Sequence, residues 1–150
     1  MEANRPNILI TRLSHIGDCV LTLPMANRIK AILPDSHIVW AIESPTQKLL
    51  AGQSAIDEFV VVPKGWMKKP AHWQSLRQKL QSYKFDLCID PQGITKSAML
   101  GWLSGAKIRI GAKGQWGREI STWLNNGLIE PMSTHLADRS LELALSLIHI

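Results

Sequence analysis

The segment that most constrains the fold is residues 7–23, NILITRLSHIGDCVLTL. Consecutive apolar residues, Ile8 to Ile10, are followed by a break at Ser14–Asp18 and then by apolar residues at helical spacing. This order predicts a buried strand, a tight turn and the start of a helix. In open parallel sheets such turns lie at the carboxyl ends of the strands, where helix N-termini and free N–H groups bind ligands. Asp18 is therefore expected at a ligand-binding rim.

The rest of the chain alternates between strand and helix patterns. Strands are predicted over residues 7–13, 37–42, 59–62, 85–90 and 108–110, and helices after the first turn, over 47–51, 71–83 and 96–104, and from 135 onward. Short connections between such elements indicate an α/β fold with a doubly wound parallel sheet.

The first helix is expected to pack its apolar stripe against the sheet. The predicted stripe is Val20, Leu21, Met25, Ile29 and Ile32. Pro24 either kinks this helix or marks a second helix start with Thr22 as its cap.

Composition indicates one globular core. A chain of 150 residues is too short for two full domains, and 45% apolar with 19% charged residues excludes a disordered chain. The sequence has neither a basic-then-apolar leader nor an apolar run of about 20 residues, which predicts a cytoplasmic location. Cys19 and Cys88 lie beside or within apolar runs, so both are expected to be buried, reduced thiols.

Positive charge is concentrated in the middle of the chain. Between Glu58 and Glu119 there are eleven Lys and Arg residues and two acids, Asp86 and Asp90. Such an imbalance favours an anionic partner, because the segment cannot neutralise itself. The alternative is a solvated basic surface.

The end of the chain predicts a fragment. From His135 onward the helical segment is apolar on nearly every side, and its last turn has no glycine, asparagine or basic residue. A helix of this kind needs a covering partner, which we expect outside this sequence. The alternatives are burial inside this domain or in a homodimer.

Two nucleotide-binding motifs are absent from the sequence. A dinucleotide fingerprint needs three glycines, and the first turn has only Gly17. A P-loop needs an earlier glycine than Gly93 before Lys96-Ser97. Glu43 follows the predicted second strand, where dinucleotide-binding folds have the carboxylate that binds ribose. A ribose-binding role of Glu43 therefore stays open.

Two segments carry a resemblance to a known family. Residues 8–24, ILITRLSHIGDCVLTLP, resemble the opening of the ADP-heptose:lipopolysaccharide heptosyltransferases, glycosyltransferase family 9. Residues 85–98, FDLCIDPQGITKSA, resemble that family's strand-Asp-x-Gln-Gly-x-x-Lys-Ser turn, with shorter matches at 109–111, 117–119 and 135–139. The resemblance implies a GT-B enzyme with residues 1–133 as its Rossmann-like acceptor-binding N-terminal domain. Residues 134–150 would begin an interdomain helix, and the C-terminal nucleotide-sugar domain would be absent.

The resemblance also implies a reaction and partners. Heptose would move from ADP-heptose to the Kdo/heptose inner core of lipopolysaccharide with inversion, without a metal or other cofactor. The partners would be the lipid A-Kdo acceptor, the nucleotide-sugar donor and, by peripheral contact, the cytoplasmic face of the inner membrane. The fragment alone would be inactive.

The family's functional positions match particular residues. Asp18 matches the catalytic base, with helix capping as its structural alternative. The expected acceptor-binding residues lie on the same rim, in the basic segment 64–69, or near the end of the chain: Ser14, His15, Gly17, Lys68, Lys69, Gln92, Gly93, Lys96, Arg118 and Arg139. The family uses arginine in the basic segment, where this chain has lysine. Lys96 could instead be a surface lysine, while Arg118 and Arg139 could pair with Glu119 and Asp138.

Two other functions stay open on the sequence. One is a plain Rossmann-like nucleotide-binding module, and the other is a binder of single-stranded nucleic acid that uses the basic segment and its tryptophans. Against the second, Trp73 and Trp102 are placed on apolar helix faces and no recognition motif is present, so no nucleic-acid partner is expected.

Overall fold

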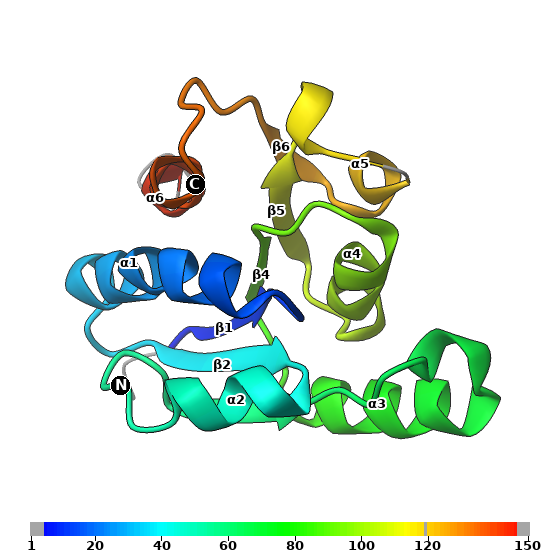
Figure 1. The fold of residues 1–150 in the computed structure, drawn as a ribbon. Helices are drawn as coiled ribbons and strands as arrows, with labels where there is room; N and C mark the ends of the chain where they lie inside the picture. Colours follow the sequence, from blue (N-terminus) through cyan, green and yellow to red (C-terminus); the bar gives the residue numbers. More distant parts are fainter. Residues whose placement is uncertain (1–4, 119, 147–150) are drawn as a thin grey trace.

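A computed structural model describes residues 5–118 and 120–146. They form a six-stranded sheet in the order β3-β2-β1-β4-β5-β6 (Figure 1). The strands are β1 (Asn7–Thr11), β2 (His37–Ile42), β3 (Glu58–Val61), β4 (Leu87–Asp90), β5 (Ile108–Ala112) and β6 (Gly127–Ile129). Every neighbouring pair is parallel, which confirms the predicted doubly wound α/β fold.

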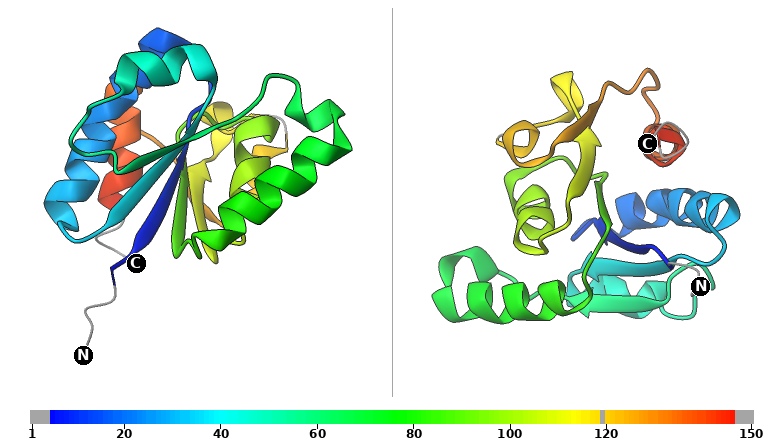
Figure 2. Two further views of the ribbon diagram at one scale, coloured as in Figure 1. Left: turned by 90° about the horizontal axis from the view of Figure 1, so that it is seen from below. Right: turned by 180° about the vertical axis from the view of Figure 1, so that it is seen from behind.

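Helices cover both faces of the sheet (Figures 1 and 2). One face carries α1 (Ile16–Ile32), α2 (Ser44–Leu50) and α6 (Leu136–Leu145), and the other carries α3 (Pro70–Ser82), α4 (Thr95–Leu103) and α5 (Ser121–Leu124). The 3-10 turns η1 (Trp66–Lys68) and η2 (Gly114–Trp116) precede α3 and α5. α2 begins before the predicted residue 47, because Pro45 fits the first turn of a helix. The sequence patterns missed α5 and β6, which are only four and three residues long.

β1 lies at the centre of the sheet because its side chains are apolar on both faces. Ile8 and Ile10 join the core under α1 and α6, while Leu9 joins the core under α3 and α4. All three are fully buried. The strand order reverses at β1. The chain first adds β2 and β3 on one side of β1 and then adds β4, β5 and β6 on the other side. Ligands of open α/β sheets bind at such a switch point.

α1 differs from its predicted form. It is one continuous helix with Pro24 inside it, so the second start at Thr22 is wrong. The buried stripe is Cys19, Thr22, Met25, Ala26 and Ile29, whereas Val20 and Leu21 are 47% and 38% exposed. Thr22 can be buried because its hydroxyl donates to the carbonyl oxygen of Asp18. Apolar spacing alone therefore placed the stripe wrongly at its first turn.

α6 packs beside α1, as both views of Figure 2 show. Leu143 and Ala144 are buried in this contact, and the carboxylate of Glu142 accepts the N–H groups of Met132 and Ser133. The described part of the predicted helix is thus partly covered within the chain, while Leu145 is 37% exposed. The expected covering partner outside this sequence stays a prediction. Residues 147–150 of that helix lie outside the described residues.

Two further expectations concern burial, and a third concerns membrane-spanning helices. Cys19 and Cys88 are free and buried, as predicted, and burial raises the pKa of Cys19 to about 11. Trp102, which was predicted to lie on an apolar helix face, is 53% exposed. Among the helices described here, none has the length and apolar character needed to cross a bilayer.

Candidate active site at the sheet rim

The turns that follow β1 and β4 are tied together at the switch point. The N–H of Leu13 donates to Oε1 of Gln92 at 2.8 Å, and Nη1 of Arg12 donates to the carbonyl of Pro91 at 3.0 Å. These bonds explain why the β1 ladder ends at Thr11, before the predicted Leu13. The two residues after the strand bond to the neighbouring turn instead.

Asp18 lies in the first turn of α1 beside this junction. Its Oδ2 is 3.0 Å from Nη2 of Arg12, and its side chain is 43% exposed. Within residues 5–118 and 120–146, no backbone N–H donates to this carboxylate, so the capping alternative lacks support. Asp18 is therefore accessible at the rim, and its role as a base stays a prediction.

Arg12 was missed by the sequence analysis. Its side chain is only 7% exposed, and its backbone carbonyl accepts the indole N–H of Trp40 at 2.8 Å. Nε of Arg12 is buried and has no hydrogen-bond partner in the described structure. The sequence did contain a signal for this role. Arg12 is the only charged residue in the predicted strand 7–13, and a buried arginine needs a partner.

A cavity of about 300 Å³ opens between α1, the β4–α4 turn, η2 and α6. Its lining brings together four residues predicted from distant parts of the sequence: Asp18, Gln92, Arg118 and Arg139. Arg12 and Trp116 also line it. Three arginines face one carboxylate here, so the lining favours an anionic ligand.

Arg139 reaches this cavity from α6. Its guanidinium carbon lies 3.8 Å from the ring centroid of Trp116, and Nη1 donates to the carbonyl of Thr134. Burial, followed by the nearby positive charge of Arg12, lowers the pKa of Arg139. These contacts replace the alternative pairing with Asp138. Arg118 is exposed at the rim, and its alternative partner Glu119 lies outside the described residues.

Asp90 shapes the turn that carries Gln92. Its fully buried carboxylate accepts the N–H of Gly93 at 3.0 Å, the Asn125 amide at 3.0 Å and the Thr11 hydroxyl at 3.4 Å. Burial raises the pKa of Asp90. Gly93 has φ +67°, and a Cβ there would lie 2.5 Å from the carbonyl oxygen of Trp116. The turn therefore requires glycine, and Asp90 fixes its shape.

Lys96 and Glu43 form a second charged pair on the rim. Nζ of Lys96 is 3.5 Å from Oε1 of Glu43, whose side chain is 9% exposed. Because Glu43 is buried and already paired, a ribose-binding role is disfavoured. Lys96 stays a predicted acceptor contact. Its structural role is to balance the negative charge of the buried Glu43 carboxylate.

Ser14, His15 and Gly17 lie at the entrance to α1. His15 has φ +65°, which is unusual for a residue with a side chain. A Cβ added to Gly17 would meet nothing within 4 Å, so its backbone faces open space. The carbonyl of Ser14 accepts a bond from the thiol of Cys19.

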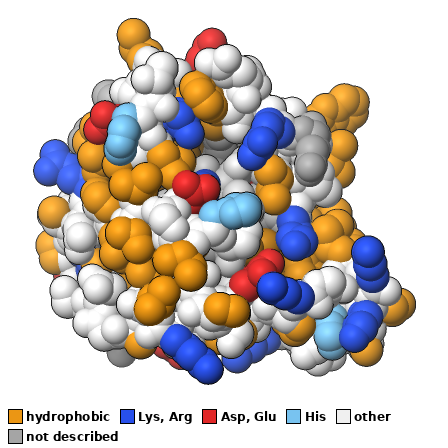
Figure 3. Space-filling view, viewed as in Figure 1, with side chains coloured by type: hydrophobic (Ala, Val, Ile, Leu, Met, Phe, Trp, Pro, Cys, Tyr) orange, Lys and Arg blue, Asp and Glu red, His pale blue; other side chains and the backbone are white. Residues whose placement is uncertain are grey.

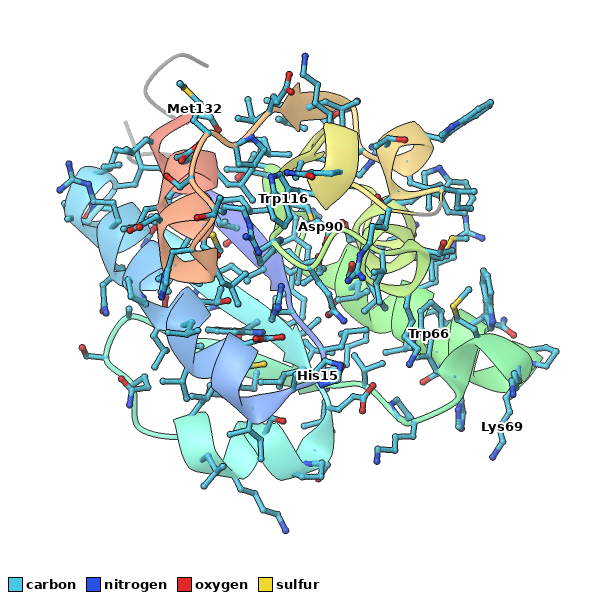
Figure 4. All side chains as sticks on the ribbon, turned by 45° about the horizontal axis from the view of Figure 1, so that its top comes forward. His15, Trp66, Lys69, Asp90, Trp116 and Met132 are labelled. Carbon is cyan, nitrogen blue, oxygen red and sulfur yellow. The ribbon has the colours of Figure 1, made fainter. Side chains whose placement is uncertain are left out.

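Lys68 and Lys69 lie apart from the cavity. Figure 4 shows Lys69 and Trp66 away from Asp90 and Trp116. Both lysines are exposed, whereas Trp66 is buried and packs on Trp73 with ring centroids 5.3 Å apart. The acceptor-binding roles of Lys68 and Lys69 stay predictions. In the part of the chain that the structure describes, no three His, Cys, Asp or Glu side chains gather as metal ligands.

Comparison with known proteins identifies relatives of this site and fold. Lipopolysaccharide heptosyltransferase 1 of Escherichia coli K12 is 27% identical over 145 residues, which cover 91% of this chain and 46% of that protein. The lipopolysaccharide core heptosyltransferase OpsX of Haemophilus influenzae is 27% identical, with 88% and 38% covered. The chain thus spans about half the length of the curated relatives it matches, or less.

Solved structures agree with these relatives. The E. coli heptosyltransferase WaaC with ADP-2-deoxy-2-fluoro heptose matches with a TM-score of 0.83 and 26% identity, over 93% of this chain and 47% of that one. A glycosyl transferase family 9 protein of Veillonella parvula shares the fold, with a TM-score of 0.81 at 24% identity over 98% of this chain and 43% of that one. The family model described as glycosyltransferase family 9 (heptosyltransferase) matches residues 73–149. This chain therefore belongs to glycosyltransferase family 9.

Proposed function

We propose that this chain is the acceptor-binding part of an inverting, metal-independent heptosyltransferase. The complete enzyme would move heptose from ADP-heptose to the Kdo/heptose inner core of lipopolysaccharide. The observation that carries the proposal is the Asp18 carboxylate, held at an open rim by the buried Arg12 and facing a cavity lined by arginines. The relatives named above support the donor and the product.

Asp18 would act as the general base. One oxygen of its carboxylate takes the proton of the acceptor hydroxyl while that hydroxyl oxygen attacks the anomeric carbon of heptose. The bond from this carbon to the diphosphate breaks, and ADP leaves with the electron pair. Attack from the face opposite the leaving group inverts the anomeric centre. Arg12 contributes by fixing the orientation of the carboxylate, which an exposed side chain would not keep by itself.

The arginines of the cavity would hold the acceptor. Kdo carboxylates and lipid A phosphates are anions, and guanidinium groups bind both with paired hydrogen bonds. Arg139 is already oriented by the ring of Trp116. Gln92, Lys96 and the backbone at Gly17 would contact the neutral parts of the sugar on the same rim. Lys68 and Lys69 would contact more distant anionic groups of the acceptor.

The donor would be held by residues beyond this chain. The relatives are about twice as long, and apolar side chains are exposed at the start of α1 and on α2: Ile16, Val20, Leu21 and Leu49. A second domain that covers this surface would exclude water from the reacting atoms. The 150 residues alone are therefore expected to be inactive. Because the acceptor is a lipid, the enzyme would contact the cytoplasmic face of the inner membrane peripherally.

The two alternative functions are less well supported. A nucleotide-binding module would use Glu43 for ribose, but Lys96 occupies that carboxylate. A binder of single-stranded nucleic acid would stack bases on its tryptophans, but Trp66 is fully buried.

The test is heptosyl transfer by the protein extended through its downstream reading frame. Asp18→Asn should lower kcat by about 10²–10⁴-fold, because it removes the base and keeps the shape. Asp35→Asn is the matched control, since Asp35 is an exposed carboxylate in the α1–β2 turn. Turnover by Asp18→Asn equal to that of the control would refute the assignment, and absence of heptosyl transfer by the unchanged extended protein would refute the function.

A further inference from the structure

The outer face of α3 and α4 has an apolar groove that no catalytic role explains. Its volume is about 640 Å³, and it is lined by Met67, Pro70, Trp73, Gln74, Arg77, Trp102 and Leu103. Trp102 is 53% exposed here. An indole half exposed beside a groove of apolar side chains is available to a partner.

A second hollow continues this surface on the other side of Trp102. It measures about 400 Å³, shares Arg77, Trp102 and Leu103 with the groove, and extends to Lys107 and Arg109. Trp102 therefore stands between two adjoining hollows. We call the lining of both the α3–α4 face.

The α3–α4 face is cationic at its edges. Neither hollow is lined by an acidic residue, and Lys68 and Lys69 adjoin Met67 and Pro70 in the chain. Arg109 donates to the carbonyls of Leu124 and Ala106, but no carboxylate of the described residues pairs with Arg77 or Lys107. Figure 3 shows blue and orange side chains together over η1 and the start of α3.

We propose that the α3–α4 face docks on the surface of an anionic phospholipid bilayer. Trp102 enters the headgroup region, where the amphipathic indole ring is favoured. Arg77 and Lys107 lie against the lipid phosphates, with their aliphatic stems along the apolar groove. The proposal assigns residues to the membrane contact of the proposed function, and its test requires no sugar transfer.

The same face fits nucleic acid poorly. Single strands need several aromatic rings in succession, and the neighbouring rings are occupied. Trp66 is fully buried, while Trp73 packs on it and donates its indole N–H to the carbonyl of Met67. Trp102 is thus the exposed ring of the groove, which suits insertion at a bilayer surface better than base stacking.

The test is cosedimentation of the full chain with vesicles. We expect binding to phosphatidylcholine vesicles that contain phosphatidylglycerol, little binding to phosphatidylcholine alone, and loss of binding in roughly 0.5 M salt. Trp102→Ala should weaken binding about tenfold. Arg77→Gln with Lys107→Gln should weaken it about fivefold for each cation removed.

Matched controls separate this face from general effects. Trp123→Ala removes a tryptophan that is 87% exposed on α5, and Arg28→Gln with Lys48→Gln removes two exposed cations from α1 and α2 on the opposite face of the sheet. Both should bind like the unchanged chain, as should Asp18→Asn. Equal weakening by the controls, equal binding to neutral vesicles, or binding to a single-stranded oligonucleotide in place of vesicles would overturn the proposal. None of these results would alter transfer to a lipid-free acceptor, so the proposed function is tested separately.

Discussion

The carboxylate of Asp18 lies 3.0 Å from the guanidinium of Arg12, and the two side chains differ sharply in exposure, at 43% and 7%. The buried partner is fixed by the Pro91 carbonyl, and the exposed partner faces the cavity. Because of this difference in exposure, Arg12 can hold the carboxylate of Asp18 in place while that carboxylate stays accessible to a ligand.

The first prediction concerns the strength of this pair. A double-mutant cycle with Arg12→Gln and Asp18→Asn should give a coupling of about 0.5–1 kcal/mol in the free energy of unfolding, because one partner is exposed. Arg12→Gln alone should cost about 1–3 kcal/mol, since it also removes the partly buried hydrogen bond to the carbonyl of Pro91. Urea unfolding of the four proteins measures both values. A coupling near zero would show that Arg12 does not hold Asp18 in solution.

The second prediction uses two glycines in helices. Gly17→Ala should leave stability unchanged or raise it by up to about 1 kcal/mol, because a Cβ there meets nothing within 4 Å. Gly101→Ala should lower stability by about 1–3 kcal/mol, since its Cβ would lie 2.8 Å from Sγ of Cys88. In the extended enzyme, Gly17→Ala should raise KM for the acceptor. An unchanged KM would remove Gly17 from the acceptor site.

The third prediction is a pH dependence at Asp90. Because burial raises its pKa in the folded chain, folding favours the protonated carboxyl group. That contribution is complete below the ordinary carboxyl pKa and is lost as the pH rises through the raised folded value. The unchanged chain should therefore lose stability relative to Asp90→Asn as the pH rises from the ordinary carboxyl pKa through the raised folded value. Urea unfolding across this range measures the difference, and a constant difference would contradict the raised pKa.

The fourth prediction separates two roles of Lys96. Lys96→Gln should destabilise the chain by about 1–3 kcal/mol, because it leaves the Glu43 carboxylate buried without its partner. Adding Glu43→Gln should restore the stability. If Lys96 also contacts the acceptor, the double variant of the extended enzyme will keep a raised KM. Recovery of both stability and KM would assign Lys96 to Glu43 alone.

Much of the fold follows from local patterns in the sequence. Runs such as Ile8–Ile10 and residues 38–42 are apolar at every position, which is typical of strands covered on both faces. Short connections then require parallel pairing and place Asp18 and Gln92 at one edge of the sheet. The family motifs at 8–24 and 85–98 named the same two turns. All of this depends on neighbours in the chain, which a sequence shows directly.

The remaining features depend on contacts between distant segments. The burial of Arg12 and its hold on Asp18 require the turn after β4, and the approach of Arg139 to Trp116 requires α6 to pack on α1. Trp102 is exposed because α3 and α4 pack so that a groove remains between them beside this side chain. By itself the sequence determined the layers, the strand direction and the rim, because these follow from periodicity and connection length. Only the tertiary structure decided which charges are buried, paired or free, since burial and pairing arise when segments far apart in the chain are packed together.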